Sequence, residues 1–208
     1  LVVFPFVKKT MSLKMVYTAS LLGYATHGLL DACTSYGTQL FWPFSNERVT
    51  WNNISIVDPL FTIPIVMLVA SAIKTRMRMF SFFAIGWIAL YLSLGFIQYE
   101  RALSTAMDLA YSRGHNADRL TLKPSFGNLV LWKSIYQHED VFYVDAIRTF
   151  RSSTWCSGES IRMFDYQYHL PNLDKTSQQA KDIERFRWFS QDYLGYDYKN
   201  NLVTDIRY

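Results

Sequence analysis

Cysteine is scarce in this chain: Cys33 and Cys156 are the only two among its 208 residues. A disulfide framework of the kind that stabilises small secreted domains normally needs more cysteines, and no Cys-x-x-Cys pair offers a zinc site. We therefore expect two free thiols. The sequence also lacks a glycine-rich phosphate-binding loop, internal repeats and low-complexity tracts. These absences leave the apolar segments, and a few polar residues within them, as the informative features.

Charge is scarce in the first 98 residues, which hold seven basic and three acidic side chains. Their net charge of +4 equals that of the whole chain, so the residues that follow are balanced. The basic character therefore belongs to the apolar half, where Lys and Arg flank apolar segments as they do in membrane proteins. We expect membrane lipids as partners and no nucleic acid.

Three apolar segments are each about 20 residues long, over residues 13–36, 54–73 and 79–98. A helix of that length crosses about 30 Å of hydrocarbon. Buried core helices of a large soluble protein are the alternative, but three in succession with short connections argue against it. Residues 1–7 are also apolar and are interpreted as the remnant of an earlier span. We therefore expect a transmembrane helical domain over residues 1–98, with three or more transmembrane helices.

Basic residues near the ends of these segments suggest the orientation. They are Lys8, Lys9 and Lys14 before the first span, and Lys74, Arg76 and Arg78 between the second and third. The positive-inside rule assigns both clusters to the cytoplasm. The loop over residues 44–54 and everything after Gln98 are then expected on the outer side.

The sequence changes character after residue 98. Residues 99–127 are expected to form a helix that leaves the membrane and then a linker, with Gly114 as the helix stop. The segments "NLVLWKSIYQ" and "VFYVDAIRTF" are rich in β-branched and aromatic residues and flank "HED", which predicts a hairpin. A helix is expected from Thr176 to Gly195. Residues 128–208 are thus predicted to form a small α+β soluble domain outside the membrane, which offers a surface for a protein partner.

Three ionisable residues lie in or beside the apolar segments. His27 and Asp31 are four residues apart, so they share one face of a helix. Asp58 begins the next helix from the same outer side, so all three can meet at one depth. Because an ionisable side chain inside a membrane is costly, three at one depth suggest a site. Histidine with carboxylates suits a divalent metal such as Zn²⁺ or Mn²⁺, and a purely structural His–Asp pair is the alternative.

The stretch "HGLLDACTSYGTQLFWP", followed by "VDPL", resembles the bacterial membrane-bound metal-dependent hydrolases, a family of inner-membrane-associated proteins related to YdjM. The shared pattern is His-x-x-x-Asp-x-x-Thr-x-x-Gly, a proline-containing loop, and Asp-Pro at the next helix. The matching positions here are His27, Asp31, Thr34, Gly37, Pro43, Asp58 and Pro59. The family also carries an upstream His-Arg and Thr-His motif that nothing here matches, so the metal ligand set in this chain is expected to be incomplete.

The resemblance implies a metal-dependent hydrolase in the bacterial inner membrane, and the positive-inside assignment then predicts the C-terminal domain on the periplasmic side. His27 and Asp31 would hold the metal, Asp58 would be a catalytic base or a further ligand, and Thr34 and Gly37 would support the site. Metal-activated water would attack an ester or phosphoester, and a site near the outer surface suggests a lipid substrate.

Enzymatic activity is not settled by the residues, and two other classes stay open. One is a non-enzymatic membrane scaffold or binding protein, in which the His–Asp pair is structural and the outer domain recognises a partner. The other is a proton or ion path through His27, Asp31 and Asp58. Bound metal would favour the hydrolase, and pH-sensitive flux without hydrolysis would favour the path.

Overall fold

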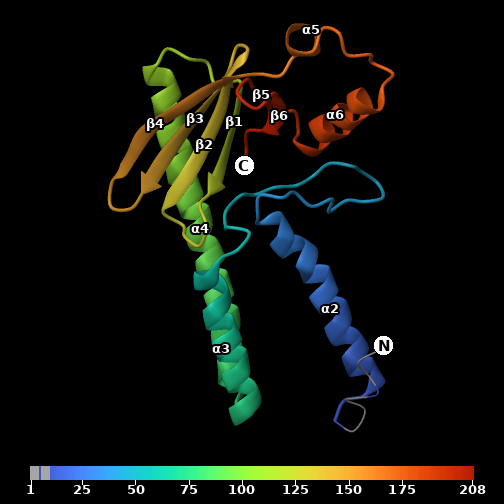
Figure 1. The fold of residues 1–208 in the computed structure, drawn as a ribbon. Coiled ribbons are helices and arrows are strands. Elements are labelled where there is room, and N and C mark those ends of the chain that lie inside the picture. Colours follow the sequence, from blue (N-terminus) through green and yellow to red (C-terminus); the bar gives the residue numbers. More distant parts are fainter. Residues whose placement is uncertain (1–4, 6–9) are drawn as a thin grey trace. The chain divides into compact units, whose positions relative to one another are not determined.

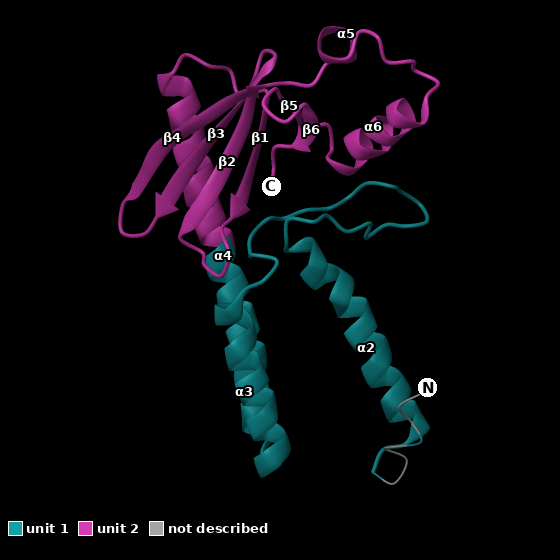
Figure 2. Ribbon diagram, in the orientation of Figure 1, with its two compact units in different colours: residues 1–95 teal, residues 96–208 magenta. Residues whose placement is uncertain are grey.

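The computed structural model describes residue 5 and residues 10–208, and the chain divides into two compact units between Gly95 and Phe96 (Figure 2). Unit 1 contains α2, α3 and the first part of α4. Unit 2 contains the rest of α4, the strands β1 to β6, and α5 and α6 (Figure 1). The predicted remnant of an earlier span over residues 1–7 lies, apart from residue 5, outside the described residues, as do Lys8 and Lys9.

The helices of unit 1 begin and end at local sequence signals. They are α2 (Leu13–Ala32), α3 (Pro59–Thr75) and α4 (Arg78–Ser112), the last continuing into unit 2. Ser12 caps α2 by accepting a hydrogen bond from the amide of Met15 at 3.3 Å. Asp58 caps α3, and Pro59 follows at its first position, where a missing N–H leaves no bond unmade. Arg76, with a left-handed φ of 57°, ends α3.

Among the described residues, α4 is the one helix long and apolar enough to cross a membrane. The prediction of three or more transmembrane helices is therefore wrong. α3 is apolar but has 17 residues, about 25 Å at 1.5 Å per residue. It is short because Asp58 caps it, which leaves residues 54–57 outside the helix. α2 has 20 residues, but Tyr, Thr, Ser, Gly and His lie among them. α2 also contains the charged residues Lys14 and Asp31, so its length alone was a poor guide to membrane insertion.

The connection between α2 and α3 folds back on itself. Thr38 and Val49 exchange backbone hydrogen bonds of 3.0 and 2.9 Å, which closes a hairpin-like loop. Gly37 permits the turn because its φ is +82° and a Cβ there would meet a neighbouring side chain at 3.0 Å. The Arg48 side chain donates to the backbone carbonyls of Tyr36 and Gly37 and fixes the same turn.

Unit 2 is built on a four-stranded antiparallel sheet in the order β1-β2-β3-β4. Its strands are β1 (Arg119–Pro124), β2 (Leu131–His138), β3 (Val141–Thr149) and β4 (Ser153–Arg162). The predicted hairpin is confirmed, since β2 and β3 pair from Leu131 opposite Arg148 to His138 opposite Val141. Glu139, with a φ of 52°, lies in the tight turn that joins them.

The two faces of this sheet are covered by different elements of unit 2. On one face, Ala102 and Ala106 of α4 pack against Leu122, Trp132 and Ile147, and all five are fully buried. Alanines allow the helix to approach the sheet closely. The other face carries a second cluster, made by Ile135 and Phe142 of the sheet with Tyr193 and Ile206 of the C-terminal part.

The C-terminal part of unit 2 contains two short helices and a two-stranded sheet. These are α5 (Tyr166–His169), α6 (Gln178–Phe189), β5 (Leu194–Asp197) and β6 (Leu202–Asp205). Ser177 caps α6, not Thr176 as the sequence suggested. The predicted end at Gly195 is also wrong, because Gln191 and Asp192 take left-handed φ values of 51° and 63° and turn the chain into β5.

Candidate functional site

Asp58 is buried at the start of α3 and uses both carboxylate oxygens. Its Oδ1 accepts a hydrogen bond from the amide of Phe61 at 3.2 Å, which caps the helix. Its Oδ2 accepts one from the hydroxyl of Tyr91 at 2.8 Å, which ties α3 to α4. Trp87 adds a second tie by donating from its indole nitrogen to the carbonyl of Phe61 at 3.2 Å. The carboxylate predicted to be a catalytic base therefore has a structural task.

His27 and Asp31 lie on one face of α2, one turn apart. Nε2 of His27 is 3.9 Å from Oδ2 of Asp31, and the two side chains are 71% and 54% exposed. Two ligands of one Zn²⁺ ion each lie about 2.0–2.2 Å from it, so two atoms about 4 Å apart can both reach one metal ion after a small side-chain rotation. The pair therefore offers two donors that are accessible from outside unit 1.

A complete cluster does not form around this pair in the part of the chain that the structure describes. No group of three or more His, Cys, Asp and Glu side chains has a metal-binding arrangement there, so His27, Asp31 and Asp58 do not converge. The other two motif residues shape the backbone. Thr34 donates from its hydroxyl to the carbonyl of Asp31 at 2.8 Å, and Gly37 makes the turn that follows.

A buried polar segment links the end of α2 to α4, and sequence reasoning missed it. Asn52, Asn53 and Ser55 are buried although they lie in a loop. The amide of Asn53 donates to the carbonyl of Cys33 at 3.0 Å, and its side chain donates to the carbonyl of Leu92 at 3.4 Å. The signal in the sequence was "WNNIS", a polar run between two apolar segments, which is also what an exposed loop looks like.

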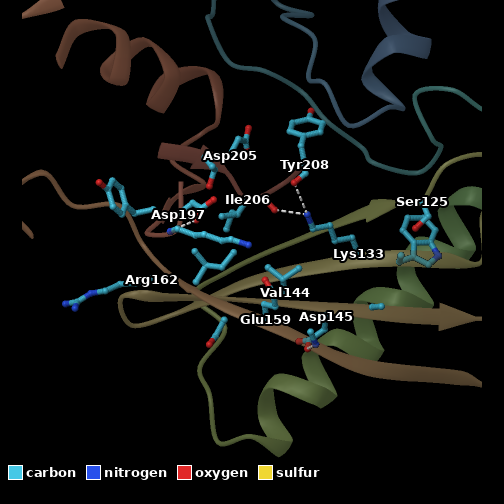
Figure 3. A pocket seen from close by; sticks show the side chains of 18 of the residues that line it. Ser125, Lys133, Val144, Asp145, Glu159, Arg162, Asp197, Asp205, Ile206 and Tyr208 are labelled. Atoms are coloured by element: carbon cyan, nitrogen blue, oxygen red, sulfur yellow. Dashed lines mark hydrogen bonds between the residues drawn. The ribbon is translucent and has the colours of Figure 1, made fainter. Parts of the chain in front are cut away.

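Unit 2 contains a cleft of about 880 Å³ between the sheet and the C-terminal hairpin. Figure 3 shows Lys133, Val144 and Glu159 on the sheet side, opposite Asp205 and Tyr208 from the C-terminal segment. The volume lies in the range of small-molecule sites, which are concave and combine apolar walls with a few polar groups. No motif in the sequence indicated this cleft, because its two walls are far apart along the chain.

A polar network holds the residue that follows α4 against the sheet. Arg113 donates to the buried carboxylate of Asp145 at 2.8 and 2.9 Å, and to the hydroxyl of Tyr136 at 2.9 Å. That hydroxyl lies 2.9 Å from Nδ1 of His115, whose ring stacks on His138 with centroids 4.3 Å apart. Burial, then the nearby His138 and Arg113, lower the pKa of His115. No sequence pattern predicted that these two histidines would lie together.

Comparison with known proteins gives one positive result. Residues 1–102 match the family described as YdjM inner membrane protein. No curated protein and no solved structure matches the chain. The matched region contains the His27–Gly37 motif, Asp58 and most of α4, and it ends before the sheet of unit 2.

Proposed function

Residues 1–102 are similar to the YdjM inner membrane protein family, and on this premise we propose that the chain is a membrane-anchored binding protein. In this proposal α4 is the anchor, and unit 2 is an extramembrane domain that binds a small ligand in its cleft. The family points to a location at the inner membrane. The binding role, the identity of the anchor and the side on which unit 2 lies are parts of the proposal.

The observation that carries the proposal is the dual character of α4. Only 17% of an apolar stretch of 18 residues in this helix is buried inside the protein, whereas the core helix of a soluble protein is mostly buried. The same helix continues without interruption and buries Ala102 and Ala106 completely in unit 2. A helix with an exposed apolar half and a packed second half suits an anchor built into the domain that it carries.

The binding role is tested by filling the cleft with a larger side chain. Ala146 is exposed on β3 and lines the cleft, so Ala146→Trp should occupy it without disturbing the core. Arg148→Trp, two residues further along the same strand and also exposed, is the matched control. The full chain in detergent is screened by thermal unfolding against neutral sugars, amino acids and phosphate esters. We expect at least one class to stabilise the wild type and the Arg148→Trp variant but not the Ala146→Trp variant. The binding role fails if no class does so.

A second candidate is metal-dependent hydrolysis in unit 1, favoured by the 3.9 Å between Nε2 of His27 and Oδ2 of Asp31. A bound divalent metal would supply an activated water for attack on an ester or phosphoester, of a lipid in particular. The donor set does not fit a complete catalytic site, however. Such sites normally use three protein ligands, and Asp58 is engaged by Phe61 and Tyr91. We therefore derive no reaction step through a metal.

Elemental analysis decides this second candidate. The full chain in mild detergent is compared with the His27→Ala/Asp31→Ala double variant after incubation with Zn²⁺ or Mn²⁺. If the hydrolase proposal is right, the wild type should hold about one ion per chain and the double variant should hold none. Cleavage of phosphate or acyl esters by the wild type should then require the metal. Equal metal content in the two proteins would reject His27 and Asp31 as ligands.

A further inference from the structure

Two lysines face each other on the sheet beside the cleft. Lys123 of β1 and Lys133 of β2 are directly opposite in antiparallel register, so both side chains leave the same face. The C-terminal segment lies over them. Nζ of Lys133 donates to the carbonyl oxygens of Ile206 at 2.8 Å and Tyr208 at 3.4 Å (Figure 3). Nζ of Lys123 lies 3.6 Å from the ring centroid of Tyr208.

Lys123 is the unusual member of the pair. It is 7% exposed, and its Nζ has no hydrogen-bond partner among the described residues. The carboxylate of Asp205 attracts both lysines, but it is held by the guanidinium of Arg207 at 2.7 and 2.9 Å. The charge of Asp205 is therefore already balanced, and the two ammonium groups remain in excess.

This excess of positive charge is costly in the protein alone. Like charges directly opposite each other destabilise a sheet, and a buried charge without a partner costs more. Burial and the charges of Arg207 and Lys133 lower the pKa of Lys123 to about 7, against the opposing influence of Asp205. An anion between the two lysines would remove the penalty.

The cleft gives an anion a route to both amines. Lys133 and Tyr208 line it directly. An ammonium group has three donors, and Lys133 uses two of them on backbone carbonyls, so one remains for a ligand. The side chain of Tyr208, which covers Lys123, is itself 59% exposed. Rotation of that side chain would uncover the amine of Lys123.

We propose that the cleft binds a phosphate monoester whose phosphoryl group lies between the ammonium groups of Lys123 and Lys133. This inference rests on the proposed binding function and adds the class of ligand. A phosphate monoester carries about −1.5 to −2 charges at pH 7 and three strong acceptor oxygens. Two lysines match that charge, whereas a carboxylate would balance one of them. The volume of about 880 Å³ leaves room for the organic part of the ligand.

Two sources share this chemistry, a soluble phosphate ester and the phosphomonoester head group of a lipid. The test therefore uses two probes with the full chain in detergent. Glycerol 1-phosphate is titrated as the soluble probe, with glycerol as its uncharged match. Phosphatidic acid in phosphatidylcholine vesicles is the lipid probe, with phosphatidylcholine alone as its match. Binding is followed by calorimetry for the soluble probe and by flotation for the vesicles after reconstitution.

The variants are Lys123→Met and Lys133→Met, with Lys181→Met as control, because Lys181 is exposed on α6 and does not line the cleft. We expect the wild type and the control to bind at least one phosphorylated probe and not its match. Each cleft variant should lose about tenfold or more in affinity, since a charge-assisted hydrogen bond is removed. Lys123→Met should still fold, because it removes a buried amine without a hydrogen-bond partner among the described residues.

The pH profile separates a ligand role from a structural one. The charged groups around the Lys123 amine are Arg207, Asp205 and Lys133. Phosphate is largely doubly charged above its second pKa of about 6, so a fall in affinity from about pH 7 to pH 9 reports the loss of the Lys123 proton. Burial also lowers the pKa of Lys133, so we expect the fall to be steeper in the wild type than in Lys123→Met.

Three results would overturn the inference: equal affinity in the wild type and both cleft variants, equal binding of each probe and its uncharged match, or no binding of either probe. If a neutral compound still stabilises the wild type but not Ala146→Trp, the binding function survives and the phosphate class is rejected. If no compound class distinguishes Ala146→Trp, both proposals fail.

Discussion

The hydroxyl of Tyr91 donates a hydrogen bond of 2.8 Å to the carboxylate of Asp58, and both residues are buried. Because Asp58 also caps α3, one carboxylate fixes both where that helix begins and how it is held against α4. The Asp-Pro pair that forms part of the family-like motif therefore has a physical explanation that needs no catalysis. This explanation does not extend to His27 and Asp31, whose side chains are exposed.

The first prediction separates these roles of Asp58. Asp58→Ala should lower the free energy of unfolding by about 2–4 kcal/mol, because the cap is lost and the Tyr91 hydroxyl is left buried without an acceptor. Tyr91→Phe should cost about 1 kcal/mol. Chemical denaturation in detergent measures both. The double variant should cost less than the two single changes added together, since they remove one shared bond. Additive effects would show that the bond contributes nothing.

The second prediction concerns the side of the membrane on which unit 2 lies. Cys156 is exposed on β4 and Cys33 is buried, so the chain carries its own reporter. If the positive-inside expectation is right, a membrane-impermeant maleimide should label Cys156 in intact spheroplasts. Cys156→Ser should abolish the labelling and thereby exclude Cys33. Labelling only after lysis would assign unit 2 to the cytoplasm and reverse the predicted orientation.

The third prediction concerns the buried ion pair that follows α4. Arg113 holds Asp145 through two hydrogen bonds, and the Asp145 side chain is 2% exposed. Arg113→Met should cost about 3–5 kcal/mol, because it leaves a buried carboxylate without its partner. Arg113→Met/Asp145→Asn should recover part of that loss. Unfolding by denaturant in detergent gives the comparison, and a double variant less stable than Arg113→Met would contradict the explanation.

The sequence predicted those elements whose signals are local. The β2–β3 hairpin and the helix that ends before Gly114 both follow from residues close together in the chain. The number of membrane spans was wrong because the length of each apolar segment was counted without the polar and charged residues of α2 and without the residues that Asp58 leaves outside α3.

The candidate site was only partly predictable, for a physical reason. The spacing of His27 and Asp31 places them on the same face of any helix, and in the structure Nε2 of His27 lies 3.9 Å from Oδ2 of Asp31. The pairing of Lys123 with Lys133 depends instead on strand register and on a C-terminal segment that folds over them. A lysine in a strand is usually solvent-exposed, so the residues next to Lys123 in the sequence did not predict that its amine would be buried.

The last prediction follows from that buried amine and concerns stability alone. The pKa of Lys123 is lowered to about 7 in the folded protein, from an ordinary value of 10.5. Between these two values the unfolded chain binds more protons than the folded one, so the free energy of unfolding should rise with pH across this window. Below about pH 7 the penalty for charging the buried amine is fully present. Lys123→Met should therefore be more stable than the wild type near pH 6, and its advantage should shrink towards pH 10 as the amine becomes neutral in both states.

Denaturant unfolding of the full chain at a series of pH values measures this difference, with Lys181→Met as the control whose difference from wild type stays flat. An advantage of Lys123→Met that does not change with pH would mean that the amine keeps its proton in the folded protein, and the unbalanced charge inferred beside the cleft would then have to be neutralised by another group.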